Sequence, residues 1–300
     1  MKIFAIVIAL LITNPVFAQL KLAPPSIPIG TELAHFVDFK SVASEIVIDT
    51  KNERSFVKTR IKFYMPARGY AIFDSVNPIQ SATIDGSVVN IESLKIPETT
   101  VLIAKKIVDE GEHVLVLTHQ LKSDLLAFDA DGVKFAFNQD DLSDRGFLEV
   151  FMPSSFQYDQ YTLSLSLQVL NSNIEHMLVA NGDVNKVSSN HWSVSFPEFY
   201  NCTMHWLHVG PKKQYVFLED NYGSIDGRIL QVTVYGKYDS LVKNGMSDTL
   251  KYLKDLESKF GAFPHKQVIV YATLPFGGGM EYAERTRQQK NPQWANSIRM

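Results

Sequence analysis

The most informative stretch of the sequence is Leu274-Pro275-Phe276-Gly277-Gly278-Gly279-Met280-Glu281-Tyr282, which ends 18 residues before the C-terminus. Its three glycines leave the backbone without side chains and free to adopt positive φ, so another chain or a ligand can approach it closely. A single carboxylate, Glu281, follows directly, with Met280 before it and Tyr282 after it. Enzymes that bind peptides use this combination to dock a substrate backbone and to hold its terminal amine.

A glycine-rich turn after a strand also suggests a phosphate-binding loop. That interpretation fails here because no Lys-Ser or Lys-Thr pair follows the glycines. The spacing of Gly277, Gly278 and Gly279 also differs from the G-x-G-x-x-G pattern of dinucleotide-binding loops. The alternative for Glu281 is an ordinary carboxylate at the end of a strand.

The N-terminus has the features of a secretory signal. Lys2 supplies a positive charge, Ile3 to Ile12 form an apolar run, and Val16-Phe17-Ala18 resembles a cleavage site before Gln19. The apolar run spans about ten residues, fewer than the ~20 that cross a bilayer as a helix. We therefore expect a signal peptide at 1–18 and an exported protein, periplasmic or secreted, with no transmembrane segment after the signal. An uncleaved anchor is the alternative.

Composition limits the remaining classes of protein. The formal net charge is -3 and the lysines and arginines are scattered, which argues against a nucleic-acid partner. Cys202 is the only cysteine, so an internal disulfide and a cysteine-rich zinc site are both excluded. The length after signal removal exceeds one average domain and favours two. No feature of the sequence indicates an oligomeric state.

The first two thirds of the chain predict a mainly β fold. Residues 19–35 contain three prolines and Gly30, which suggest an extended segment. Residues 36–210 alternate short apolar runs with turn residues, typical of an antiparallel β-saddle or sandwich. The predicted strands include Ser44–Asp49, Thr59–Tyr64, Val101–Ala104, Val114–Thr118, Tyr161–Val169 and His191–Phe196, with turns at Asp85-Gly86, Asp131-Gly132 and Asn181-Gly182.

The pattern changes after Gly210-Pro211. Ile229 to Tyr235 predicts a strand, and Tyr238 to Phe260 predicts a helix because its apolar residues recur every three or four positions. Gly261 is a typical helix stop, and Lys266 to Thr273 predicts a second strand that leads into the glycines. Residues 211–283 therefore predict the first elements of an α/β domain.

Taken together, these segments resemble the aminopeptidase N family of zinc metallopeptidases. In that family a β-saddle domain precedes a thermolysin-like catalytic domain, and a Gly-x-Met-Glu-Asn loop binds the substrate amine. Gly278-Gly279-Met280-Glu281-Tyr282 is similar to this loop, with Tyr282 in place of asparagine. The resemblance implies that peptide N-termini are the partners and that the substrate-binding residues are Gly277, Gly278, Gly279, Met280, Glu281 and Tyr282.

Upstream segments extend the resemblance over residues 36–283. Arg145 to Pro153, Met177 to Gly182 and Lys251 to Gly261 resemble family segments in the same order. The family adds a second acidic or amide side chain from the saddle domain, for which Gln139 and Asp140 are the candidates here. The alternative for these two residues is a solvated acidic loop.

The zinc chemistry of the family has no counterpart in this sequence. It requires His-Glu-x-x-His on a helix and a further glutamate, and no histidine follows His265. We therefore expect no catalytic residue, no metal ligand and no cofactor in this chain, although the full-length family binds zinc. His205 and His208 are expected to be packing or surface residues in a strand.

Residues 284–300 are polar and rich in arginine, and they resemble disordered or out-of-frame sequence. Three hypotheses remain open. The chain is a truncated, inactive fragment of an exported metallo-aminopeptidase, a non-catalytic exported module that binds peptides or a protein partner, or an unrelated β-sandwich protein.

Overall fold

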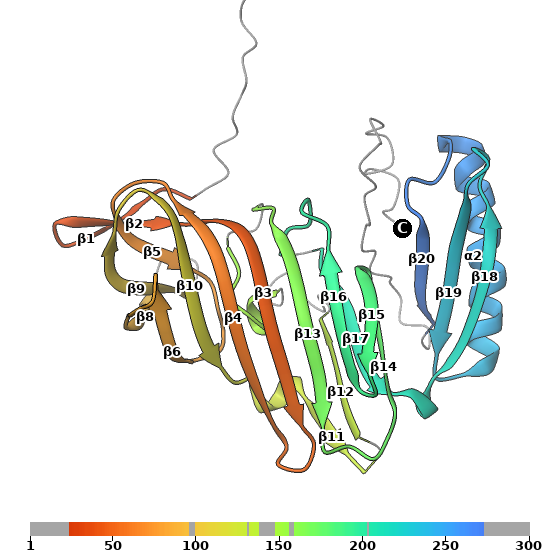
Figure 1. Cartoon of the computed structure of the whole chain (residues 1–300). Coiled ribbons are helices and arrows are strands. Elements are labelled where there is room, and N and C mark those ends of the chain that lie inside the picture. Colours follow the sequence, from red (N-terminus) through yellow and green to blue (C-terminus); the bar gives the residue numbers. More distant parts are fainter. Residues whose placement is uncertain are drawn as a thin grey trace, which may run out of the picture.

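The computed structural model describes residues 24–95, 100–130, 132–137, 148–155, 159–202 and 204–272. The fold is mainly β, as predicted, with one α-helix in these ranges (Figure 1). The elements in chain order are β1 (Ile27–Ile29), β2 (Glu32–Phe36), β3 (Asp38–Asp49), β4 (Arg54–Met65), β5 (Gly69–Phe73), β6 (Ile79–Ile84), β7 (Ser87–Val88), β8 (Ile91–Lys95), β9 (Thr100–Val108), β10 (Gly111–His119), η1 (Ser123–Leu125), β11 (Ala127–Asp129), β12 (Gly132–Phe137), η2 (Leu148–Val150), β13 (Thr162–Leu170), β14 (His176–Ala180), β15 (Asp183–Ser188), β16 (His191–Phe196), β17 (Leu207–Pro211), η3 (Lys212–Gln214), β18 (Val216–Gly223), β19 (Ile229–Gly236), α2 (Asp239–Phe260) and β20 (Gln267–Ala272).

The largest layer is an eight-stranded sheet in the order β15-β16-β13-β3-β4-β10-β6-β7. Residues along β3, β4 and β13 alternate between buried and exposed, because successive side chains of a strand point to opposite faces. The buried side chains form the main hydrophobic core. Two pairings of the β-rich part depart from the antiparallel expectation: β13 runs parallel to β3 with Leu167 opposite Ile46, and β2 runs parallel to β5 in a smaller sheet.

Two smaller sheets complete the β-rich part, in the orders β1-β2-β5-β9-β8 and β11-β12-β17-β14. Within the extended segment expected at 19–35, β1 pairs with β2 as a hairpin, with Gly30 at a φ of 62° in the turn. The Asp85-Gly86 turn joins β6 to β7, with both residues at positive φ. The signal peptide expected at 1–18 and the tail at 284–300 lie outside the described ranges.

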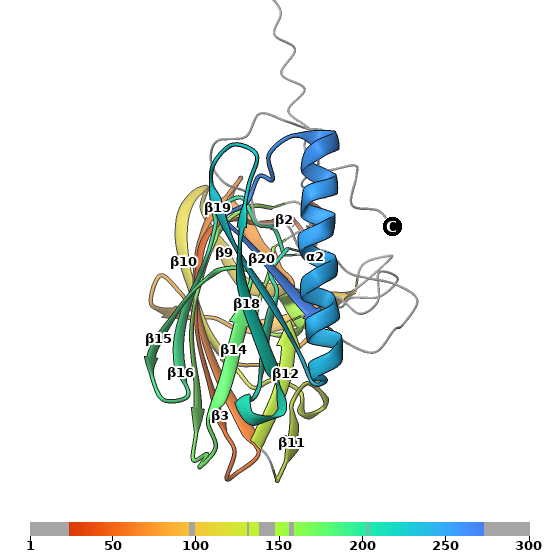
Figure 2. The same ribbon diagram turned by 90° about the vertical axis from the view of Figure 1, so that its right-hand side faces the viewer.

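The architecture changes after β17, where a three-stranded sheet in the order β18-β19-β20 begins. The predicted strand–helix–strand sequence is confirmed, because β19 and β20 are parallel and α2 connects them. Helix α2 ends at Phe260 and is capped by Gly261, which has a φ of 88° and donates its N–H to the Glu257 carbonyl. Seen from the side, α2 runs alongside the strands of this sheet (Figure 2), and its buried side chains pack against Val232 and Val234 of β19. No described helix is long and apolar enough to span a bilayer.

Glu257 fixes the end of α2 through four hydrogen bonds, three from the β18–β19 hairpin and one from the segment after the helix. Its carboxylate accepts bonds from the Ser224 hydroxyl at 2.5 Å, the Phe263 N–H at 2.7 Å, and the Tyr222 hydroxyl and Ile225 N–H at 3.0 Å each. Burial opposes the charged form, but these donors outweigh it and hold the pKa of Glu257 below its usual value. The carboxylate therefore stabilises the strand–helix junction in its ionised form.

We predict that Glu257→Gln lowers the free energy of unfolding by about 2 kcal/mol, because an amide turns an N–H₂ group toward groups that are themselves donors. Urea denaturation followed by circular dichroism at pH 7 measures this loss. The matched control is Glu219→Gln on the exposed part of β18, where we expect almost no change. Equal effects of the two substitutions would contradict the role of Glu257.

Asp159 is a second buried carboxylate, located at the seam between β13 and β3. Its Oδ2 accepts the Phe39 N–H at 2.8 Å, and its side chain is largely shielded from water. Burial raises the pKa of Asp159 to about 6. The folded state therefore binds this proton more tightly than the unfolded state, so the contribution of Asp159 to stability falls as the pH rises through 6.

We predict that Asp159→Asn and the wild type are about equally stable at pH 4, and that the variant is more stable by about 3 kcal/mol at pH 8. Denaturation at a series of pH values gives this difference directly. Asp220→Asn on exposed β18 controls for the loss of a negative charge. A difference between Asp159→Asn and wild type that does not change with pH would contradict the prediction.

Candidate functional site

The carboxyl ends of β19 and β20 form one edge of the three-stranded sheet. The parallel register places Tyr235 beside Tyr271 and Gly236 beside Ala272, and α2 begins nearby at Asp239. In α/β sheets, ligands bind outside the carboxyl ends of parallel strands. This edge is therefore the place where such a fold would be expected to bind a ligand.

Two glycines allow a close approach at this edge. A Cβ atom on Gly236 would lie 2.2 Å from the Ala272 carbonyl oxygen. A Cβ atom on Gly245 of α2 would lie 3.1 Å from Val234 Cγ1 and 3.6 Å from Ala272 Cβ. The end of β20 is thus held between its neighbouring strand and the helix with no space for a larger residue.

The residues predicted to bind substrate lie outside the described ranges. Gly277, Gly278, Gly279, Met280, Glu281 and Tyr282 follow β20, which ends at Ala272. Gln139 and Asp140 follow β12, which ends at Phe137. The structure therefore describes the two strands that lead into the predicted site, and the arrangement of these strands can be examined directly.

Strands β12 and β20 belong to different sheets, and both are neighbours of His208. Ala136 of β12 is paired with His208 of β17 in the antiparallel register, and Phe137 is paired with Leu207. The His208 ring also lies against Tyr271 of β20, with ring centroids 5.2 Å apart. Both predicted halves of the site therefore leave from strands that contact one buried histidine.

His208 is held by two tyrosine hydroxyl groups. Its Nδ1 is 2.8 Å from the Tyr235 hydroxyl and its Nε2 is 3.2 Å from the Tyr215 hydroxyl. Burial, helped by the charge of Lys237, lowers the pKa of His208 to about 4. At pH 7 the ring is neutral, so one nitrogen donates and the other accepts a hydrogen bond. Burial also raises the pKa of Tyr215 to about 12, which keeps its proton available.

Aromatic packing surrounds these hydrogen bonds. Tyr235 lies between Phe217 and Tyr271, with ring centroids 5.4 and 5.0 Å away and nearly parallel planes. Met177 and Val179 of β14 pack against the same cluster. The three-stranded sheet is therefore joined to the β-rich part by buried aromatic surface as well as by hydrogen bonds.

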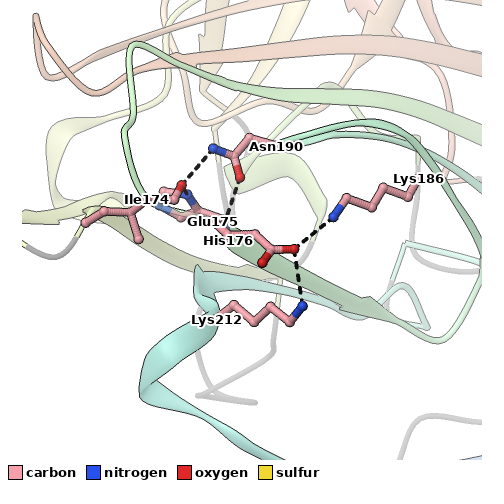
Figure 3. Close-up of polar contacts among 6 residues, drawn as sticks. All are labelled: Ile174, Glu175, His176, Lys186, Asn190 and Lys212. Atoms are coloured by element: carbon pink, nitrogen blue, oxygen red, sulfur yellow. Dashed lines mark hydrogen bonds and ion pairs between the residues drawn. The ribbon is translucent and has the colours of Figure 1, made fainter.

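A polar clamp around His176, part of which is drawn in Figure 3, holds the N-terminal end of β12. His176 Nε2 accepts the Val133 N–H at 3.2 Å, while the Nδ1 of the same ring lies 3.1 Å from the Ile174 carbonyl oxygen. Asn190, at a φ of 57°, accepts the His176 N–H through Oδ1 and donates from Nδ2 to Ile174, each at 2.8 Å. These contacts bind β12 and β14 to the turn between β15 and β16, so the clamp is structural.

The same close-up shows Glu175 between two lysines (Figure 3). Its Oε1 is 2.9 Å from Lys186 Nζ and 3.2 Å from Lys212 Nζ. Hydrogen bonds from Lys186 and Lys212, and then their charges, lower the pKa of Glu175. All three side chains are about half exposed, and exposed ion pairs contribute little to stability. This group therefore shows no catalytic arrangement.

The donors that zinc requires are not present together. The 300 residues contain no His-Glu-x-x-His, and the described residues include no group of three or more histidine, cysteine or acidic side chains placed to hold a metal. His205 lies before β17, in contact with Phe196, Tyr161 and Tyr200. Its burial lowers its pKa to about 3. His205 and His208 are both buried, but only His208 lies in the strand that was predicted for the two, because β17 begins at Leu207.

Sequence reasoning missed the cluster around His208. Tyr235 and Tyr271 each come at the end of a predicted strand, and parallel pairing of those strands is the signal that could have placed them together. Tyr215 carries no such signal, because its contact with His208 depends on the turn at η3.

We predict that Gly236→Ala lowers the free energy of unfolding by about 2 kcal/mol or more, because its Cβ would overlap the Ala272 carbonyl. Chemical denaturation measures the change. Gly223→Ala in β18 is the control, since no atom lies within 4 Å of its Cβ position. If Gly236→Ala were as stable as Gly223→Ala, the close approach at Ala272 would be refuted.

Comparison with known proteins gives no family model and no curated protein that matches the sequence. Solved structures do share the fold. Aminopeptidase A of Legionella pneumophila, in complex with aspartic acid, aligns with a TM-score of 0.57 and 14% identity. An M1 zinc metallopeptidase variant of Deinococcus radiodurans, bound to a Tyr-Ser-Ala substrate, aligns with a TM-score of 0.53 and 13% identity.

These alignments cover 79% and 78% of this chain, but 28% and 56% of the two matched chains. The present chain thus spans about a quarter of one relative in structure and about half of the other. At these identities the comparison establishes a shared fold with zinc aminopeptidases.

Proposed function

We propose that this chain provides the substrate-anchoring part of an exported zinc aminopeptidase of the M1 type. In this proposal Glu281 binds the protonated α-amine of a peptide, and Gly277–Gly279 allow the peptide backbone to approach. Gln139 or Asp140 supplies a second contact to the amine. A carboxylate in a partly desolvated cleft attracts an ammonium group more strongly than in bulk water.

The observation that carries the proposal is the convergence of β12 and β20 at His208. These strands are far apart in the sequence, yet each precedes a segment predicted to bind the substrate amine. The fold shared with an M1 metallopeptidase bound to Tyr-Ser-Ala supports the same assignment.

Zinc chemistry is not assigned to this chain. The family resemblance implies zinc, but the residues present do not fit a zinc site, because no His-Glu-x-x-His occurs in the sequence. The proposed role of these 300 residues is therefore peptide binding without hydrolysis. The signal-like residues at 1–18 support a location outside the cytoplasm.

Calorimetric titration of the whole chain with Tyr-Ser-Ala tests the binding proposal. We expect measurable binding of the free-amine peptide and none of N-acetyl-Tyr-Ser-Ala, because acetylation removes the positive charge that Glu281 binds. Glu281→Gln should weaken binding by at least tenfold. Equal binding of the two peptides, or an unchanged affinity of Glu281→Gln, would refute the assignment.

Hydrolysis provides a separate test of the inactive state. Purified chain incubated with excess Zn²⁺ and an aminoacyl-p-nitroanilide should release no chromophore above a heat-inactivated sample. Release of chromophore that a chelator abolishes would contradict the proposal.

A further inference from the structure

We propose that the outward face of β4 binds the surface of an anionic lipid bilayer, through a row of basic and aromatic side chains. The outward positions of this strand, called the β4 row below, are Arg54, Phe56, Lys58, Arg60, Lys62 and Tyr64. The row contains no acidic residue. The inference does not depend on the proposed function, because it uses only β4 and the strands beside it.

The alternation of β4 produces this row. Each residue between two members of the row is buried, so the members themselves point to the opposite face of the sheet. Successive members are therefore roughly 7 Å apart along the strand. Strand β4 lies between β3 and β10 inside the eight-stranded sheet (Figure 1). The backbone beneath the cations is thus held from both sides.

Three cations of the β4 row are unpaired. Lys58, Arg60 and Lys62 are exposed, and their side chains form no ion pair or hydrogen bond with any described residue. Two other cations on this face differ from them, since Lys40 pairs with Asp38 and Arg54 lies 3.9 Å from Asp49. The positive charges at the centre of the row therefore remain available to a ligand.

The cross-strand neighbours of Arg60 and Lys62 are uncharged. On β3 and β10 they are Ala43, Val116, Ser41 and Val114. Both valines are partly exposed, so apolar surface lies directly beside the cations. Cations next to exposed apolar side chains are typical of protein surfaces that lie in the interface of a membrane.

Two carboxylates lie beside the ends of this run of cations. Glu45 of β3 is opposite Lys58, and Glu112 of β10 is opposite Tyr64. Both glutamates are exposed. The positive charge of the face is therefore concentrated at Arg60 and Lys62, between the two acidic positions.

Phe56 adds an exposed aromatic ring to the same face. Its residue is 45% exposed, and its neighbour on β3 is the partly exposed Val47. Aromatic rings are enriched at membrane–water interfaces, and cations near an anionic membrane are attracted to its headgroups. The β4 row combines both kinds of side chain.

The apolar side chains favour a bilayer over a nucleic acid, which also presents phosphate groups. Single-stranded nucleic acids bind to aromatic rings on which their bases stack. Val114 and Val116 offer no such ring, but they can contact the acyl chains below the lipid headgroups. Phospholipids with a net negative charge are therefore the ligand that fits the whole face.

Vesicle cosedimentation of the whole chain tests the proposal. Vesicles of phosphatidylcholine are compared with vesicles of equal parts phosphatidylcholine and phosphatidylglycerol. We expect at least tenfold higher affinity for the anionic vesicles, lost as added salt screens the charges. Arg60→Gln/Lys62→Gln should weaken this binding at least tenfold. The matched control is Lys251→Gln/Lys254→Gln, which removes two exposed cations of α2 and should leave the binding unchanged.

Phe56→Ala examines the aromatic part of the row separately. We expect it to weaken binding to the anionic vesicles about threefold and to leave the salt dependence as in the wild type. The apolar run Ile3 to Ile12 is present in every sample, so its contribution cancels when variants are compared.

Three outcomes would overturn the proposal. The first is equal affinity for the two kinds of vesicle, and the second is an equal effect of the two double substitutions. The third is tighter binding to a single-stranded oligonucleotide than to the anionic vesicles, which would assign the row to a nucleic acid. All substituted side chains are exposed, so we expect wild-type melting temperatures. If a variant unfolds, the lipid and salt dependence of the wild type decides the question.

Discussion

The contact between β17 and β19, made by His208 and Tyr235, determines how the two architectures of this chain are arranged. A neutral imidazole can serve as donor and acceptor at once, and here both of its nitrogens are used by tyrosines of the adjoining segment. Buried hydrogen bonds are costly to leave unmade. The orientation of the three-stranded sheet is therefore set by directional hydrogen bonds as well as by buried apolar surface.

Two buried carboxylates, Glu257 and Asp159, have pKa values shifted in opposite directions. Glu257 receives four donors and stays ionised, which fixes the end of α2. Asp159 is buried at a seam of the large sheet, where desolvation raises its pKa to about 6. The first group stabilises the fold at neutral pH, and the second costs stability there. Neither group lies in the cluster around His208.

Local patterns predicted the elements well. The apolar period of Tyr238–Phe260 gave helix α2, and the alternation in Thr59–Tyr64 and Tyr161–Val169 gave parts of β4 and β13. Pairing was harder to predict, because β13 joins β3 across about 120 residues and in parallel. Periodicity records which face of a strand is buried, but it carries no information about the neighbouring strand.

In the candidate site, too, local features could be read from the sequence, whereas contacts between distant segments could not. Amine binding by Gly277–Tyr282 stays a prediction from local features, bare backbone and a carboxylate, because these residues lie outside the described ranges. The cluster around His208 could not be predicted, since it depends on contacts with Ala136, Tyr215, Tyr235 and Tyr271 from four other segments. Contacts between segments that are distant in the sequence become visible only when the strands are placed.

The most direct measurement of the site is the distance between its two predicted halves. Spin labels on Asp140→Cys and Tyr282→Cys, with buried Cys202 retained, report this distance by pulsed electron paramagnetic resonance. If the segments after β12 and β20 share one site, the distribution of label-to-label distances should have a single short maximum. The distribution should become narrower when Tyr-Ser-Ala is added. A long distance, unaffected by the peptide, would contradict a shared amine-binding site.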